Sequence, residues 1–153
     1  MQIYRIADRR HPVWDGMGAM LHGGRFNSPG KAVIYAATTF AGAMLEILVH
    51  ARIGKVPTSH VVAVAQLPPD LPVERVDIVA LPVGWDGTRT HIARVVGDQW
   101  LKELRSPVLL VPSIVARGEW NALVNPAHPL ASRIEVTEPS PVIWDQRLFG
   151  AAG

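Results

Sequence analysis

Cysteine is missing from this 153-residue chain, and charged residues and long apolar runs are scarce. Without thiols the chain can form no disulfide and supplies no thiolate ligand for zinc. Charged residues make up only 18% of the sequence, and no basic run exceeds Arg9-Arg10, whereas nucleic-acid-binding proteins typically carry a denser basic stripe. No apolar run approaches the roughly 20 residues that span a bilayer. These absences argue against a disulfide scaffold, a membrane protein and a direct nucleic-acid binder.

Two sequence signals are also missing. Residues 1–5 lack the basic and apolar regions of a secretory signal peptide, which together with the absence of cysteine predicts a cytoplasmic location. The six histidines show neither H-x-x-x-H nor H-E-x-x-H spacing, so we expect no metal site.

The residues that are abundant indicate one compact α+β domain. Hydrophobic residues make up 48% of the chain, enough for a core, while 13 glycines and 13 prolines imply many short connections. The length suits one domain. We therefore predict a single domain over residues 1–153, with an ordered core at about 3–148.

Hydrophobic patterns predict short strands and two substantial helices. The helix at about 40–52 has Thr38 or Thr39 as its cap and is apolar on nearly every face, which predicts that it is buried. Residues 3–6 alternate as in an edge strand, and residues 11–30 and 120–130 are expected to be loops. Further strands are expected at 31–36, 61–67, 73–76, 107–112, 134–136 and 142–144, and the second helix at 90–104.

Glu46 is the one carboxylate in the otherwise apolar helix at 40–52. On a helix its neighbours one turn away include Gly42 and Ala43, which leave room for a ligand, and His50, which could pair with it. In apolar surroundings the pKa of a carboxyl rises unless a cation faces it. The pattern alone leaves two readings open: a catalytic carboxylate, or a solvated residue paired with His50.

Other candidate residues follow glycines or end strands. Gly24 precedes Arg25 in Gly-Gly-Arg-Phe-Asn, where small residues let the backbone approach a ligand and aim the guanidinium at a phosphate or carboxylate. Tyr35 ends a strand and could stack on a ring or donate a hydrogen bond. Ser113 follows a buried strand without a Gly-x-Ser-x-Gly elbow, and Asn125 lies in a proline-rich loop. Each signal by itself also fits ordinary turn or strand chemistry.

The order of these signals resembles that of the RES-domain family, named for its Arg, Glu and Ser. The resemblance covers roughly Tyr4 to Trp144 and departs mildly at Phe26, where the family usually has Trp. It is carried by Tyr4-Arg5, Gly-Gly-Arg-Phe-Asn at 23–27, Tyr35, Glu46, Pro112-Ser113 and Asn125-Pro126-Ala127-His128-Pro129.

The resemblance implies a fold similar to ADP-ribosyltransferases, a split β core with a few flanking helices and a cleft for NAD as substrate, without metal. Members are toxins of bacterial toxin–antitoxin pairs, so it also implies an Xre-like helix-turn-helix antitoxin that blocks the cleft. Glu46, Arg25, Tyr35 and Ser113 match the family's catalytic positions. Arg25, Tyr35, Ser113, Gly24 and, less securely because Asn121 lies close by, Asn125 are expected to bind NAD.

The acceptor of the ADP-ribosyl group stays open at this point. Water or phosphate would give NAD depletion by hydrolysis or phosphorolysis, which we favour, and a protein side chain would give a mono-ADP-ribosyltransferase. A third hypothesis is an RNA-binding or ribonuclease toxin, which the pI near 9.4 and five tryptophans favour. The lack of a basic–aromatic stripe argues against it.

Overall fold

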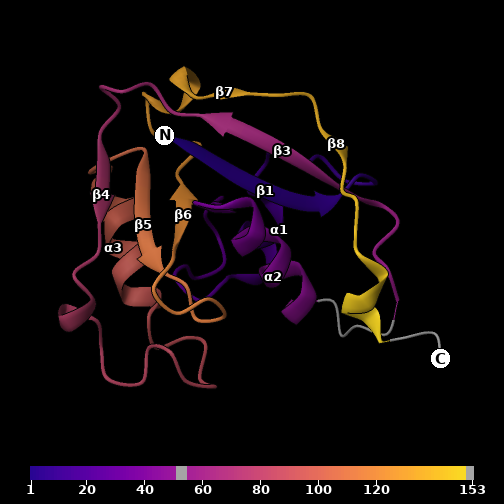
Figure 1. Ribbon diagram of the computed structural model, residues 1–153. Coiled ribbons are helices and arrows are strands. Elements are labelled where there is room, and N and C mark those ends of the chain that lie inside the picture. The colour runs from indigo at the N-terminus through magenta and orange to yellow at the C-terminus, as the bar shows by residue number, and fades with distance from the viewer. Residues whose placement is uncertain (51–54, 151–153) are drawn as a thin grey trace.

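The computed structural model describes residues 1–50 and 55–150, and its centre is a strongly curled β-sheet (Figure 1). Strands lie in the order β4-β5-β6-β2-β1-β3-β7, and β8 also pairs with β3. Neighbours are antiparallel except β4 and β5, which are parallel. The strands are β1 Gln2–Asp8, β2 Ile34–Ala37, β3 His60–Gln66, β4 Val73–Arg75, β5 Val108–Pro112, β6 Trp120–Val124, β7 Glu135–Val136 and β8 Ser140–Pro141.

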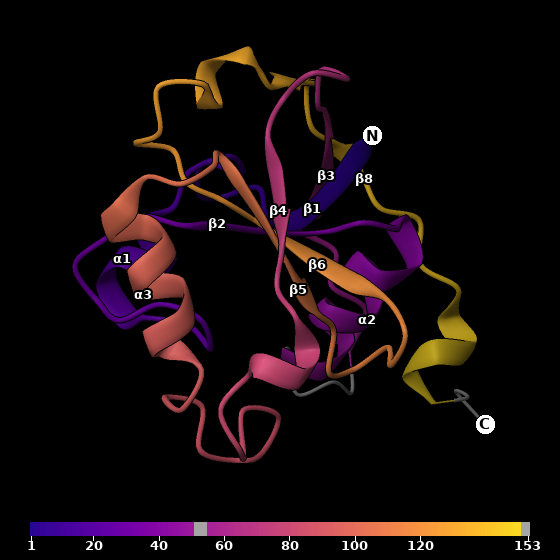
Figure 2. The same cartoon turned by 90° about the vertical axis from the view of Figure 1, so that its left-hand side faces the viewer.

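In the described residues, three α-helices flank this sheet. Figure 2 shows α1 and α3 on one side of β5 and β6, with α2 on the other. Within the described ranges, no helix is long and apolar enough to cross a membrane. The helices are α1 Met17–His22, α2 Phe40–His50 and α3 Arg94–Glu103, and short 3-10 turns lie at 78–80, 131–133 and 146–149. The predicted α+β class is confirmed.

The sheet is split into two halves between β1 and β2. These strands share only one paired position, Tyr4 with Ala37, whereas β1 pairs with β3 along all of Gln2–Asp8. The half formed by β2, β6, β5 and β4 therefore diverges from the half formed by β1, β3, β7 and β8. This divergence creates the junction at which the candidate site lies.

Alternating side chains of β5 and β6 fill two cores. Val108 and Leu110 face the core inside the curl of the sheet, while Leu109 and Val111 face the core beneath α3. Both faces are covered, so β5 is apolar at every position. In α3, a Cβ at Gly97 would lie 1.7 Å from the carbonyl oxygen of Phe26. The helix therefore packs directly on the backbone of the segment that carries Arg25.

Two environments differ from those predicted. β1 is not an edge strand, because it pairs on both sides, and its polar position Arg5 lines a cavity instead of facing solvent. α2 is not buried all round: Leu45 and Val49 keep 40% and 58% of their surface exposed. Only one side of α2 packs on the sheet, so its apolar composition overstated its burial.

The predicted cap is confirmed at Thr39, whose Oγ1 accepts a hydrogen bond from Gly42 N (2.9 Å).

Two segments expected to be loops contain regular structure. α1 lies within 11–30 and buries none of its residues, so it left no apolar periodicity to detect. β6 lies within 120–130, where the prolines at 126 and 129 obscured a five-residue strand. The strand expected at 142–144 lies at 140–141 instead. The expected end of α2 at residues 51–52 falls outside the described residues.

Candidate active site

A cavity of about 420 Å³ lies at the junction of the two sheet halves. Its walls come from β1, β2, β6, α2, the end of β5 and the loop after α1. The volume is in the range of small-molecule sites. Side chains with polar or charged groups in the lining include Arg5, Arg25, Tyr35, Glu46, His50 and Asn121.

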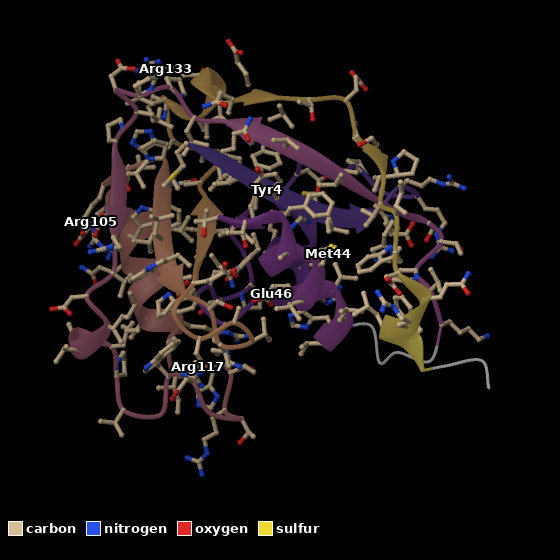
Figure 3. All side chains as sticks on the ribbon, in the orientation of Figure 1. Tyr4, Met44, Glu46, Arg105, Arg117 and Arg133 are labelled. Carbon is tan, nitrogen blue, oxygen red and sulfur yellow. The ribbon has the colours of Figure 1, made fainter. Side chains whose placement is uncertain are left out.

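Glu46 has both carboxylate oxygens held by other side chains. Asn121 Nδ2 donates to Oε1 (2.8 Å), and Ser113 Oγ lies 3.5 Å from the same oxygen. His50 Nε2 lies 3.4 Å from Oε2, one helical turn away. The sequence left open whether Glu46 pairs with His50 or faces a ligand cavity, and the structure contains both features. Figure 3 shows Glu46 on α2, near the middle of the molecule.

The surroundings of Glu46 keep its carboxylate ionised at neutral pH. Burial alone raises the pKa of Glu46, but hydrogen bonds from His50 and Asn121 outweigh it and leave that pKa below its usual range. Conversely, the hydrogen bond to Glu46 raises the pKa of His50, against the opposing effects of burial and of Arg25. The cavity therefore presents an oriented negative charge.

Arg25 is held by the backbone of a distant loop. Its Nη1 donates to the carbonyl oxygens of Trp85 and Gly87, both at 2.9 Å. Among residues 1–50 and 55–150, the side chain of Arg25 forms hydrogen bonds only through Nη1, which leaves the edge formed by Nε and Nη2 for a second, bidentate partner. The guanidinium thus has a fixed position in the cavity wall and donors available for an anion.

Tyr35 supports the loop before Arg25 with its hydroxyl. That hydroxyl donates to Asn27 Oδ1 (2.7 Å) and accepts from Phe26 N (3.2 Å), and burial raises the pKa of Tyr35 strongly. A Cβ at Gly24 would lie 2.6 Å from the same oxygen. The absence of a side chain at Gly24 therefore lets the Tyr35 hydroxyl approach the backbone closely, whereas the sequence suggested close approach of a ligand. The ring of Tyr35 still lines the cavity.

Ser113 and Asn121 meet at the end of the β5–β6 hairpin. Ser113 is 3% exposed, and its Oγ accepts from Ala116 N (3.0 Å) while facing Glu46. Asn121 pairs across the sheet with Val111, two residues before Ser113. The sequence predicts a loop at 120–130, so it does not reveal that β6 pairs with β5. Recognising a strand at 120–124 would have placed Asn121 beside Ser113.

Asn125 is not part of the cavity lining. It lies four residues beyond Asn121 along the direction of β6, or about 13 Å at the usual rise of a strand. Its Oδ1 accepts from Ala127 N (3.0 Å) in a local turn, and its backbone N–H donates to Pro107 O (2.9 Å). The structure thus brings Asn121, not Asn125, to Glu46.

Arg5, which the sequence singles out only as part of the Tyr4-Arg5 motif, is a second cation in the cavity. Its Nε donates to Val13 O (2.6 Å) and its Nη1 to Tyr35 O (2.7 Å). Burial lowers the pKa of Arg5, with the Asp15 carboxylate partly opposing the effect. Among the described lining residues, two guanidinium groups and one carboxylate thus share the cavity, which suits a ligand with both anionic and cationic parts.

In the part of the chain that the structure describes, the fold and the site together define an α+β domain with one fixed carboxylate in a cavity that two arginines line. The chain matches the RES domain over residues 2–145 and belongs to that family.

Relatives and a solved structure are similar over most of their lengths. The chain is 36% identical to the Prs ADP-ribosylating toxin of Sphingobium sp., over 90% of this chain and 87% of that protein. It is 36% identical to a toxin Res of Pseudomonas putida (88% and 91%) and 33% identical to one of Yersinia enterocolitica (97% and 99%). A chain in the crystal structure of the M. tuberculosis MbcT–MbcA toxin–antitoxin complex superposes with a TM-score of 0.75, at 18% identity, over 92% of this chain and 83% of that one.

Proposed function

We propose that this protein is a toxin that cleaves NAD at the nicotinamide–ribose bond, with Glu46 as the catalytic carboxylate. The observation that carries the proposal is Glu46 itself, ionised and held at both oxygens inside a cavity with two arginines. Relatives named toxin Res and Prs ADP-ribosylating toxin, at 36% identity, support both the toxin role and NAD as the substrate.

The chemistry needs one carboxylate. Cleavage of a glycosidic bond passes through an oxocarbenium-like state, which a nearby carboxylate stabilises. Nicotinamide in NAD is already cationic and departs as a neutral molecule, so no acid has to protonate it. Glu46 would bind the ribose hydroxyls and stabilise the positive charge that develops as the bond breaks.

The other residues would bind and orient NAD. Arg25 offers its Nε–Nη2 edge to the pyrophosphate, and Arg5 adds a second positive charge in the same cavity. Tyr35 has its hydroxyl engaged within the chain, so we assign its ring face to the nicotinamide end. Ser113 and Asn121 would act on the ribose through Glu46.

We propose water or phosphate as the acceptor, which yields nicotinamide with ADP-ribose or ADP-ribose 1″-phosphate and arrests growth by NAD depletion. A specific observation favours a second candidate, mono-ADP-ribosylation of a protein: the Sphingobium relative is named for ADP-ribosylating Prs. Both reactions break the same bond and would use the same cavity.

Product analysis separates the two candidates. The purified protein is incubated with NAD alone, with phosphate, or with a bacterial extract, and nicotinamide, ADP-ribose and labelled protein are quantified. Depletion predicts stoichiometric loss of NAD without any protein acceptor. If NAD is lost only when extract is present, and the labelled ADP-ribosyl group is found on one protein, the transferase reaction would replace NAD depletion as the proposed function.

We also propose an antitoxin partner, an Xre-like helix-turn-helix protein that occupies the cavity. A neighbour of similar fold in a toxin–antitoxin complex supports an antitoxin partner. Co-expression of the adjacent small open reading frame should restore growth and yield a complex that no longer consumes NAD. A complex that retains full NAD consumption would contradict blockage of the cavity.

A further inference from the structure

Two surface loops meet beside Arg25, and an ion pair joins them. The 82–87 loop provides both carbonyl groups that hold Arg25, from Trp85 and Gly87. The residue between them, Asp86, pairs through Oδ2 with Arg117 Nη1 at 2.9 Å. The Arg117 guanidinium also lies over the Trp85 ring, 5.9 Å from its centroid. Two contacts therefore tie Arg117 to the loop that orients Arg25.

Arg117 belongs to the 113–119 loop, which begins at the residue facing Glu46. Ser113 N donates to Glu119 O (2.9 Å), Ala116 N donates to Ser113 Oγ (3.0 Å), and Glu119 N donates to Ala116 O (3.0 Å). These bonds make the 113–119 loop a compact unit. Figure 3 shows Arg117 nearer the edge of the molecule than Glu46.

We propose that the Asp86–Arg117 ion pair latches the 82–87 loop to the 113–119 loop and so positions Arg25. The inference rests on the proposed function, in which Arg25 binds the pyrophosphate of NAD. Neither Asp86 nor Arg117 lines the cavity, so both are positioning residues. The latch connects the support of Arg25 with the loop that holds Ser113 against Glu46.

The Asp86 and Arg117 side chains are exposed, so their ion pair can position Arg25 without contributing much to the stability of the whole fold. The side chains of Arg117 and Asp86 are 59% and 39% exposed, and surface pairs of this kind contribute little to folding. Arg117 first, and Arg25 more weakly, keep the pKa of Asp86 below its usual range.

The kinetic test compares charge-removing and charge-conserving variants. In Arg117→Gln and Asp86→Asn, KM for NAD should rise about two- to fivefold at unchanged kcat and unchanged melting temperature, the range expected for one exposed ion pair. Arg117→Lys should keep KM near the wild-type value. Asp70→Asn is the matched control, because it removes another surface ion pair, with Arg133 (2.6 Å), that joins distant segments away from the cavity.

A structural readout keeps the latch testable without NAD. Trp85 N and Gly87 N donate within their own loop, to Pro82 O and Gly84 O. Amide exchange of these two protons, measured by NMR, should accelerate in Arg117→Gln although the substitution lies in the other loop, and should stay unchanged in Asp70→Asn.

The outcomes of the two readouts are distinguishable. If wild-type protein leaves NAD intact, the proposed function fails, while faster exchange in Arg117→Gln would still support the latch. If wild-type protein consumes NAD but Arg117→Gln changes neither KM nor exchange, the latch is overturned. If amide exchange is faster in Arg117→Gln but KM is unchanged, the ion pair does not position Arg25. An equal rise of KM in Asp70→Asn would overturn this positioning as well.

Discussion

Glu46 and Arg25 line the same cavity but are supported differently. Glu46 lies on α2, and side chains from α2, β6 and the end of the β5–β6 hairpin fix its oxygens. Arg25 lies in a loop, and two backbone carbonyl groups of the exposed 82–87 loop fix one of its nitrogens. The carboxylate is thus built into regular elements, and the cation depends on loop–loop contacts.

In the proposed function, Glu46 takes part in the chemical step and Arg25 binds NAD, and the difference in support suits these two roles. A carboxylate that stabilises developing charge acts best when its orientation is fixed before the reaction, because no reorganisation is then needed. A binding group tolerates adjustment, and loops on a rigid scaffold commonly supply such groups. We therefore expect changes around Glu46 to alter kcat and changes around Arg25 to alter KM.

The largest effect is expected for Glu46→Gln. The amide keeps the shape of the side chain but removes its charge, so kcat for NAD consumption should fall at least about 100-fold, as for the loss of other transition-state electrostatic contacts. The melting temperature should stay close to the wild-type value, and growth arrest on expression should be relieved. The matched control is the exposed Glu138→Gln. Persistent toxicity of a folded Glu46→Gln protein would refute the catalytic role.

Arg25→Lys tests the binding half of the comparison. Lysine keeps the positive charge but cannot bond two carbonyl groups and also offer a bidentate fork. Loss of a charged hydrogen bond predicts a rise in KM of roughly 10- to 100-fold with a smaller change in kcat, measured by initial rates. Arg9→Lys, at an exposed position, serves as the control. A fall in kcat at constant KM would place Arg25 in the chemical step instead.

Asn121→Ala should shift the pH dependence of the reaction. The Asn121 hydrogen bond lowers the pKa of Glu46, so its removal raises that pKa. As pH falls, the variant should therefore begin to lose activity at a higher pH than the wild-type protein. We expect the acidic limb of the kcat/KM profile to move to higher pH. Asn125→Ala should leave this limb in place. A shift with Asn125→Ala and none with Asn121→Ala would reverse the assignment made from the structure.

His50→Gln should give the smallest effect. Pairing with Glu46 raises the pKa of His50. The contribution of this pair to the stability of the folded state is therefore complete below the ordinary histidine pKa, and it is lost as pH rises through the raised pKa of His50. The side chain is 76% exposed, so the free energy of unfolding should lose less than about 0.5 kcal/mol at pH 5.5 and nothing at pH 9. Urea unfolding of His50→Gln and His11→Gln at both pH values checks this. An equal loss at pH 9 would show that packing, not charge, is involved.

Much of the fold could be predicted where hydrophobic patterns are strong. The strand at 107–112 corresponds to β5, because it is a continuous apolar run bounded by prolines. The helix at 90–104 corresponds to α3, because its apolar residues recur at helical spacing and face a core. α1 and β6 were missed because one buries nothing and the other lies among proline-rich turns. β1 was taken for an edge strand because local alternation does not reveal that its polar face meets a cavity.

The sequence by itself determined the class of the domain and the candidate set of Arg25, Tyr35, Glu46 and Ser113. The order of these residues along the chain carries that information, because it resembles the order in the RES-domain family, whereas each residue by itself also fits ordinary turn or strand chemistry. Only the tertiary structure decided the partners. Asn121 reaches Glu46 through the register of β5 with β6, and Arg25 is held by carbonyl groups 60 and 62 residues away. Such contacts depend on how strands pair and loops meet, which local pattern does not encode.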